Sequence, residues 1–149
     1  MKKPVEVCVT GIHSRPGEPT EKVVTNSSGI YQDLEDGRYQ LEYEEDQGLD
    51  GSSKVHNKIL IASDGTGMEI VRGGENGNRL EFRDSLEYTT EYLTPYGSMN
   101  MKIITKSFDF NRSHHDLEMK LMAEYQLEMA GQVLSDSMII IEIKNAATT

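Results

Sequence analysis

Between residues 117 and 129, apolar and polar side chains alternate strictly along the chain. The seven odd positions are apolar or aromatic, and five of the six even positions between them are polar. These residue types, rich in Leu, Met and Glu, favour a helix by intrinsic propensity. A helix would nevertheless spread the apolar residues around its whole circumference, whereas a strand places alternate residues on one face. The alternation therefore predicts a long strand with one buried face.

The same alternation recurs in five other segments of the chain. They are Val5–Val9, Tyr39–Tyr43, Leu80–Phe82, Leu86–Tyr92 and Met99–Ile103. Turn-forming residues lie between such segments, and the pairs Asp36-Gly37 and Asp64-Gly65 are each expected to supply the two positive-φ positions of a type I′ turn. Ala130-Gly131-Gln132 is expected to reverse the long strand into a last strand near Met138–Ile143.

These segments predict an all-β protein, a single antiparallel up-and-down β-barrel of the calycin or lipocalin type with eight to ten strands. A barrel hides the sheet edges that an all-β chain must protect, and a two-sheet sandwich is the alternative. The apolar parity also slips between Thr105 and Phe108, which predicts a β-bulge of the kind that bends strands at barrel corners. The length of 149 residues fits one domain spanning residues 1–149.

The overall composition excludes several classes of function. The chain carries 15 Lys and Arg against 25 Asp and Glu, a formal charge of −10, which argues against binding nucleic acid or an anionic membrane surface. The single cysteine, Cys8, excludes an intrachain disulfide and fits a reducing compartment. The longest apolar runs, Ile59–Ala62 and Met138–Ile141, are too short to span a bilayer, and no signal peptide is evident. We therefore expect a cytoplasmic protein.

Several short motifs recur in an order that resembles a known family. They are Gly29-Ile30-Tyr31, Leu41–Glu45, Arg72-Gly73-Gly74, Tyr92–Gly97 and Met101–Thr105. Together they resemble the YwiB-like family of small bacterial proteins, a domain of unknown function with a calycin-type barrel, over about Val5 to Ile143. The resemblance implies an antiparallel barrel in a bacterial cytoplasmic protein, and it implies no reaction. Calycin barrels often hold a small ligand, which is an argument from fold alone.

Two charged residues keep the parity of the apolar face in their segments. Arg72 follows Met68 and Ile70, and Glu45 follows Tyr43. An inward charge is costly to bury unless it pairs with an opposite charge or with a ligand. Arg72 and Glu45 are therefore candidates to orient a ligand at a barrel mouth. The more common arrangement is that both residues lie at strand ends in water, or that they pair with each other and hold the barrel end together.

Tyrosines supply the other candidate ligand contacts. Tyr43, Tyr88 and Tyr92 share parity with core aliphatics, and their hydroxyl groups need partners if they are buried. Such a lining can bind a small amphipathic molecule, or it can form a solid tyrosine-rich core. The leading expectation is non-enzymatic binding of a small, partly apolar ligand, with no cofactor. A protein-interaction module that uses an outer sheet face is the alternative, and an enzyme with a site at the barrel mouth is the least favoured.

The remaining chemistry-bearing residues carry weak signals. His114, His115 and Asp116 have the residue types of a metal site, but neighbouring side chains on a strand point to opposite faces, so a solvated loop is favoured and no metal site is predicted. Cys8 has opposite parity to Val7 and Val9, and His13 lies on the other face from it. A nucleophilic cysteine needs a nearby base, so catalysis at Cys8 is not expected.

Apolar residues on both faces of the last strand predict self-association. Ile139, Ile141 and Ile143 occupy one face, while Met138 and Ile140 occupy the other. Met122 breaks the polar parity of the preceding strand. Exposed apolar patches usually mark an interface, so these three outer residues predict a homodimer. The alternative is that a loop or the N-terminal segment covers them within one chain.

Overall fold

The computed structural model describes residues 2–47, 53–73, 78–94, 97–113 and 118–146. Ten strands account for nearly all of them: β1 (Lys2–Ser14), β2 (Glu21–Asp33), β3 (Tyr39–Gln47), β4 (Ser53–Ile61), β5 (Gly67–Arg72), β6 (Asn78–Arg83), β7 (Glu87–Thr94), β8 (Gly97–Arg112), β9 (Glu118–Met129) and β10 (Gln132–Asn145). The predicted all-β class is confirmed. The described part of the chain contains no helix with the length and apolarity that a bilayer crossing requires.

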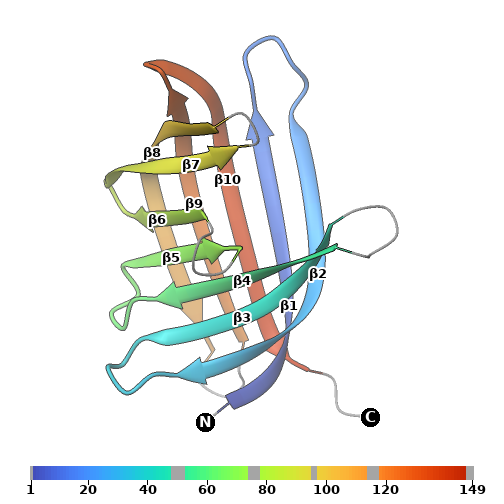
Figure 1. Cartoon of the computed structure of the whole chain (residues 1–149). Helices are drawn as coiled ribbons and strands as arrows, with labels where there is room; N and C mark the ends of the chain where they lie inside the picture. The colour runs from blue at the N-terminus through green and yellow to red at the C-terminus, as the bar shows by residue number, and fades with distance from the viewer. Residues whose placement is uncertain (1, 48–52, 74–77, 95–96, 114–117, 147–149) are drawn as a thin grey trace.

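The strands form one antiparallel sheet that curls into a nearly closed barrel. Its order is β6-β5-β4-β3-β2-β1-β10-β9-β8-β7, so strands adjacent in sequence pair with each other except β6 and β7, and the first strand pairs with the last. The two edge strands, β6 and β7, come next to each other and almost close the ring. In Figure 1 the long strands β1, β9 and β10 run vertically, and β3–β6 cross them. The predicted up-and-down barrel is confirmed.

One apolar face of every long strand builds the interior. On β9 the odd positions Met119, Leu121, Ala123 and Tyr125 are buried, as the alternation predicts, and Leu127 and Met129 pack against them. On β10 the buried face carries Ile141 and Ile143. Because periodicity rather than helix propensity decides the structure of β9, tertiary burial is the stronger term in this segment.

The predicted bulge lies on β8. Thr105 pairs with Tyr125 and Ser107 pairs with Glu124, so Lys106 is the extra residue and the register shifts there. The bulge shifts the inward parity from odd positions before Lys106 to even positions after it. It also buries the Thr105 hydroxyl without a hydrogen-bond partner among the described residues.

Replacing Thr105 with Val is expected to stabilise the protein by about 1 kcal/mol, because a buried hydroxyl without a partner carries an uncompensated desolvation cost. Valine keeps the β-branched shape and removes the oxygen. Urea unfolding of the variant and the parent measures the difference. Thr89→Val, at an exposed position of β7, is the control and is expected to change stability by less than about 0.5 kcal/mol. Destabilisation by Thr105→Val would show that the hydroxyl is satisfied.

The type I′ prediction is wrong for Asp36-Gly37 and Asp64-Gly65. Only the glycines have positive φ, 91° at Gly37 and 72° at Gly65. Each aspartate instead accepts a hydrogen bond from the backbone N–H two residues later, at Arg38 and Thr66. This bond lowers the pKa of Asp36, and the hydroxyl of Thr66, which donates to Asp64 Oδ1 at 2.6 Å, together with the Thr66 N–H lowers the pKa of Asp64. These Asx-type bonds hold longer turns. Among the described residues, two consecutive positive-φ residues occur at Ala130 and Gly131, where β9 reverses into β10.

Candidate functional site

Side chains fill the barrel interior. Its largest members expose less than 2% of their surface: Tyr31, Phe82, Leu41, Ile59, Ile61, Ile103, Met119, Leu121, Ile141, Ile143, Val5 and Val7. Two hollows of about 570 and 750 Å³ that described residues line are on the outside of the barrel. A ligand would therefore be held at an end of the barrel, where the inward residues change from apolar to polar.

Such a change occurs along one row of β3, β4 and β5. Tyr43 pairs with Asn57, and Asn57 pairs with Arg72, so the three side chains share the inner face. Tyr43 and Asn57 are buried, Asn57 to 1% exposure, and Arg72 is half-buried at the end of β5. The Asn57 amide donates to the Val55 carbonyl oxygen at 3.4 Å, a long and weak bond. The register therefore places Tyr43 and Arg72 on either side of Asn57, with all three on the inward-facing parity of their strands.

Asn57 is a site residue that the sequence analysis missed. Asn57 has the same parity as Ile59 and Ile61, which are fully buried on the same strand. The sequence feature that could have identified it is therefore an amide side chain at an inward position of β4. The next row of the barrel, Leu41–Ile59–Ile70, is wholly apolar. The polar row thus caps the apolar core at this end.

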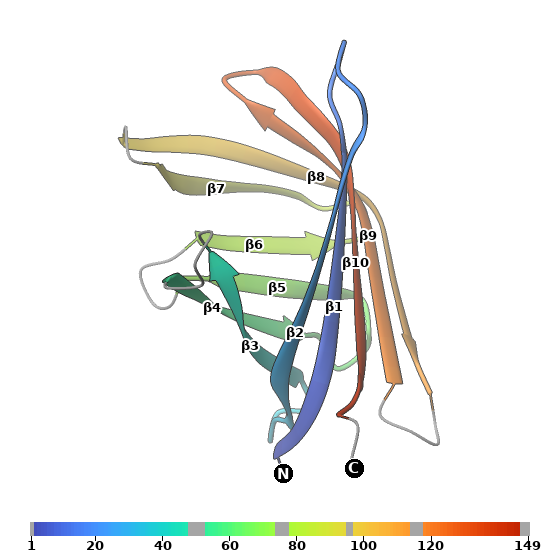
Figure 2. The same cartoon turned by 90° about the vertical axis from the view of Figure 1, so that its right-hand side faces the viewer.

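The other predicted ligand contacts are Tyr88, Glu45 and Tyr92, and the structure describes the side chain of Tyr88 alone. Tyr88 on β7 pairs with the fully buried Ile103 and packs, half-buried, against the core. Glu45 pairs with Val55 on β4, and Tyr92 pairs with Met99 on β8, but their side chains lie outside the described residues. The strands that carry Tyr43, Arg72 and Tyr92 all end on one side of the barrel, on the left in Figure 2.

A second inward arginine, missed in the sequence analysis, lies at another end of the barrel. Arg112 stands over the Tyr39 ring at 5.0 Å, and Tyr39 stacks on Phe110 and on Tyr31 with centroid separations of 6.1 and 6.2 Å. Arg112 keeps the parity of Phe108 and Phe110 after the bulge, and this parity is the sequence feature that could have predicted its inward position. Its cation–π contact is made within the chain, so this arginine closes the barrel end.

The hydroxyl of Tyr31 belongs to the same end. It donates to Asp33 Oδ1 at 2.6 Å. Burial, together with this hydrogen bond to a carboxylate, strongly raises the pKa of Tyr31. The tyrosine therefore stays neutral at physiological pH and acts as a structural donor.

A third inward polar group joins β1, β9 and β10. His13 Nδ1 lies 2.8 Å from Ser137 Oγ, which lies 3.0 Å from Ser135 Oγ. Burial raises the pKa of the Tyr125 phenol, and a hydrogen bond with Ser137 partly offsets the rise. A serine beside a histidine has the residue types of a nucleophile and its base, but Ser137 is buried to 7% exposure. The arrangement satisfies the hydrogen bonding of buried polar groups.

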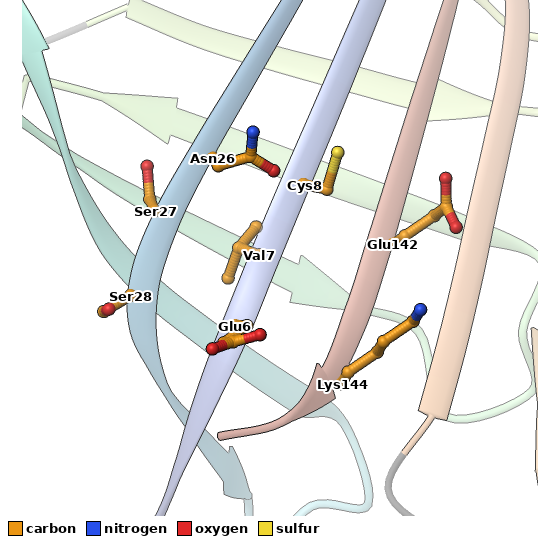
Figure 3. Close-up of a pocket in the computed structure, with 8 residues that line it drawn as sticks. All are labelled: Glu6, Val7, Cys8, Asn26, Ser27, Ser28, Glu142 and Lys144. Atoms are coloured by element: carbon orange, nitrogen blue, oxygen red, sulfur yellow. The ribbon is translucent and has the colours of Figure 1, made fainter. Parts of the chain in front are cut away.

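Cys8 lies on the outer face, in a polar hollow of about 570 Å³ over β2, β1 and β10. Figure 3 shows it beside Asn26 and Glu142, with Glu6 and Lys144 further along the strands. His13 is on the opposite face, so Cys8 lacks the histidine that nucleophilic cysteines commonly use. No histidine is among the described residues that line the hollow.

A larger outer groove, about 750 Å³, follows β1–β4 where β2 and β3 begin to separate. Its apolar part contains Pro4, Ile30 and Ala146, and its polar part includes the ion pair between His56 Nε2 and Glu42 Oε2 at 3.0 Å. Beyond that pair, the charged residues that line the groove are Lys2, Glu6 and Glu44. The predicted histidine loop at His114 and His115 lies outside the described residues.

Comparisons with known proteins agree with this geometry. A family model described as a domain of unknown function, DUF1934, matches residues 7–141. The crystal structure of the ywiB protein from Bacillus subtilis is similar, with a TM-score of 0.80, 16% sequence identity, and coverage of 98% of this chain and 94% of that chain. Comparison with curated proteins gave no match. At this identity the structural likeness shows the fold alone, and the expected resemblance to the YwiB-like family is confirmed. Since the family model covers most of the sequence, the chain belongs to the DUF1934 family of domains of unknown function.

Proposed function

We propose that this protein binds a small, partly apolar ligand without catalysing a reaction on it, at the end of the barrel where Tyr43, Asn57 and Arg72 form one inward row. The observation that supports the proposal is an inward arginine beside a fully buried asparagine, directly next to the wholly apolar row Leu41–Ile59–Ile70. Inward polar groups at the end of an apolar interior are the usual composition of a small-molecule site.

The residues of the row define the chemistry of the ligand. The Arg72 guanidinium offers donors in a planar fork that matches a carboxylate or a phosphate. The Asn57 amide and the Tyr43 hydroxyl add neutral hydrogen-bonding groups, and Ile70 and Leu80 provide apolar surface nearby. The ligand class is therefore a small molecule with one anionic group and an apolar body. We propose Tyr88 as a further ligand contact. Glu45 and Tyr92 remain ligand contacts predicted from the sequence.

Two measurements test the proposal. Native mass spectrometry of the protein purified from its own host is expected to show a small molecule bound at one per chain. A thermal-shift screen of amphipathic carboxylates and phosphates is expected to find ligands that raise the melting temperature, because a molecule that binds only the folded state stabilises it.

Arg72→Gln is expected to raise the dissociation constant of the tightest-binding of these ligands by about tenfold or more, since the substitution removes a charge-assisted hydrogen bond. The matched control is Arg79→Gln on β6, whose side chain is exposed and pairs with Glu69 at 2.9 Å on the outer face. The control is expected to leave affinity unchanged. If no small molecule copurifies and no library member shifts the melting temperature, Arg72 holds the barrel end together and the proposal is wrong.

A further inference from the structure

The outer face of the barrel carries an apolar patch centred on β1 and β10. We define the outer apolar patch as Ile12, Val24, Met122, Met138 and Ile140. Val24 is 51% exposed and the other four are half-buried. All ten strands belong to one sheet, so no second sheet of the described chain packs over this face. Contiguous exposed apolar surface of this kind marks a contact with another molecule.

The strand register arranges the patch in two parallel rows across β2, β1, β10 and β9. One row reads Val24–Thr10–Ile140–Met122, and the next reads Lys22–Ile12–Met138–Glu124. The second row has a lysine at one end and a glutamate at the other. Three strand spacings, about 14 Å, separate these two charges, so they cannot pair within one chain.

This distribution of charge is complementary to itself. A twofold axis that lies in the interface plane, parallel to the strands and midway between β1 and β10, exchanges the two ends of each row. It places Lys22 opposite the partner subunit's Glu124, and Val24 opposite the partner subunit's Met122. Two such sheets pack face to face about 10 Å apart, within reach of Lys and Glu side chains. The two ion pairs form at the ends of a centre that is apolar except for the buried Thr10.

From this complementarity we propose that the outer apolar patch is the interface of a symmetric homodimer with its axis between β1 and β10. An isologous interface requires one surface to match itself, and this face does so in both charge and apolarity. The two rows of the patch lie about 7 Å apart along the strands and form the apolar centre of a larger outer face. Four strands spaced about 4.8 Å apart and about 40 Å long give that face, with the polar positions on either side of the patch included, at most about 760 Å² per subunit, against about 800 Å² per partner in a standard interface.

Sedimentation velocity of the full chain at micromolar concentration tests the proposal. The wild type is expected to sediment as a dimer, and Ile140→Glu and Met122→Glu are each expected to sediment as monomers with an unchanged circular dichroism spectrum. Lys58→Glu, a charge change on β4 away from the patch, is the control and is expected to stay dimeric. A wild-type monomer, or a dimer that both glutamate variants leave intact, overturns the proposal.

A charge reversal tests the axis without placing a charge in the apolar centre. Lys22→Glu alone and Glu124→Lys alone each set like charges against each other across the axis. Each is expected to raise the dimer dissociation constant about tenfold. The double variant Lys22→Glu/Glu124→Lys restores opposite charges and is expected to restore the dimer. Because the two residues are too far apart to pair within one chain, recovery reports contact between subunits, and a lack of recovery contradicts the proposed axis.

Discussion

Gly29→Ala is expected to destabilise the protein by about 3 kcal/mol, a large effect for one added methyl group. A Cβ at Gly29 would lie 2.7 Å from the carbonyl oxygen of Glu42 and 3.2 Å from both Val7 Cγ2 and Tyr43 Cβ. The nearest of these atoms belongs to the backbone of β3, so relief requires β2 and β3 to move apart. That movement disturbs the start of the β2–β3 pairing, next to the Tyr43–Asn57–Arg72 row.

Gly11→Ala is the matched control. Gly11 also lies in a strand interior, but the nearest atom to its added Cβ is His13 Nε2 at 3.3 Å, so a shift of a few tenths of an ångström makes room while His13 Nδ1 stays bonded to Ser137 Oγ. Alanine also restricts the unfolded chain more than glycine does, so this variant is expected to be neutral or stabilised by about 0.5 kcal/mol. Urea unfolding of both variants gives the comparison. Equal stabilities for the two would show that β2 and β3 do not approach as closely as the structure indicates.

The fold was predictable because alternation sets which residues face inward before any long-range pairing is known. In β9 the odd positions from Met119 to Tyr125 are buried as predicted, and the parity slip near Lys106 located the bulge. The turns at Asp36 and Asp64 were predicted wrongly for a physical reason. An aspartate side chain that accepts a backbone N–H bond fixes its own residue in a turn at negative φ, and only the following glycine adopts the left-handed conformation.

The candidate site was only partly predictable. Parity along one strand predicted that Arg72 faces inward, and the same argument applies to Arg112 after the bulge. Parity does not give the register between strands, which places Asn57 between Tyr43 and Arg72. It also cannot bring His13 to Ser137, because these residues lie 124 positions apart and meet only when β1 pairs with β10. What a sequence lacks here is the alignment of one strand with the next.

The packing of the interior leads to the second large effect. Ile59 is fully buried on β4, directly between Leu41 on β3 and Ile70 on β5. Ile59→Ala is expected to cost about 3 to 4 kcal/mol, because removal of three carbon groups loses their transfer free energy and also leaves a cavity that close-packed neighbours cannot fill. Urea unfolding, with the m-value checked for two-state behaviour, measures the change.

A comparison with Leu60→Ala distinguishes a packed barrel interior from an open one. Leu60 is the next residue on β4, half-buried on the outer face between Gln40 and Glu69, and its substitution removes the same number of carbons without enclosing a void. It is expected to cost about 1 kcal/mol. In an open lumen, Ile59→Ala would lose only the transfer term, and the two variants would differ little. If Ile59→Ala lowers the free energy of unfolding by about 2 kcal/mol or more beyond Leu60→Ala, as the cavity term requires, the result supports a packed core with ligand access confined to the barrel end. Equal losses of stability for the two variants would indicate an open lumen in which a ligand can bind.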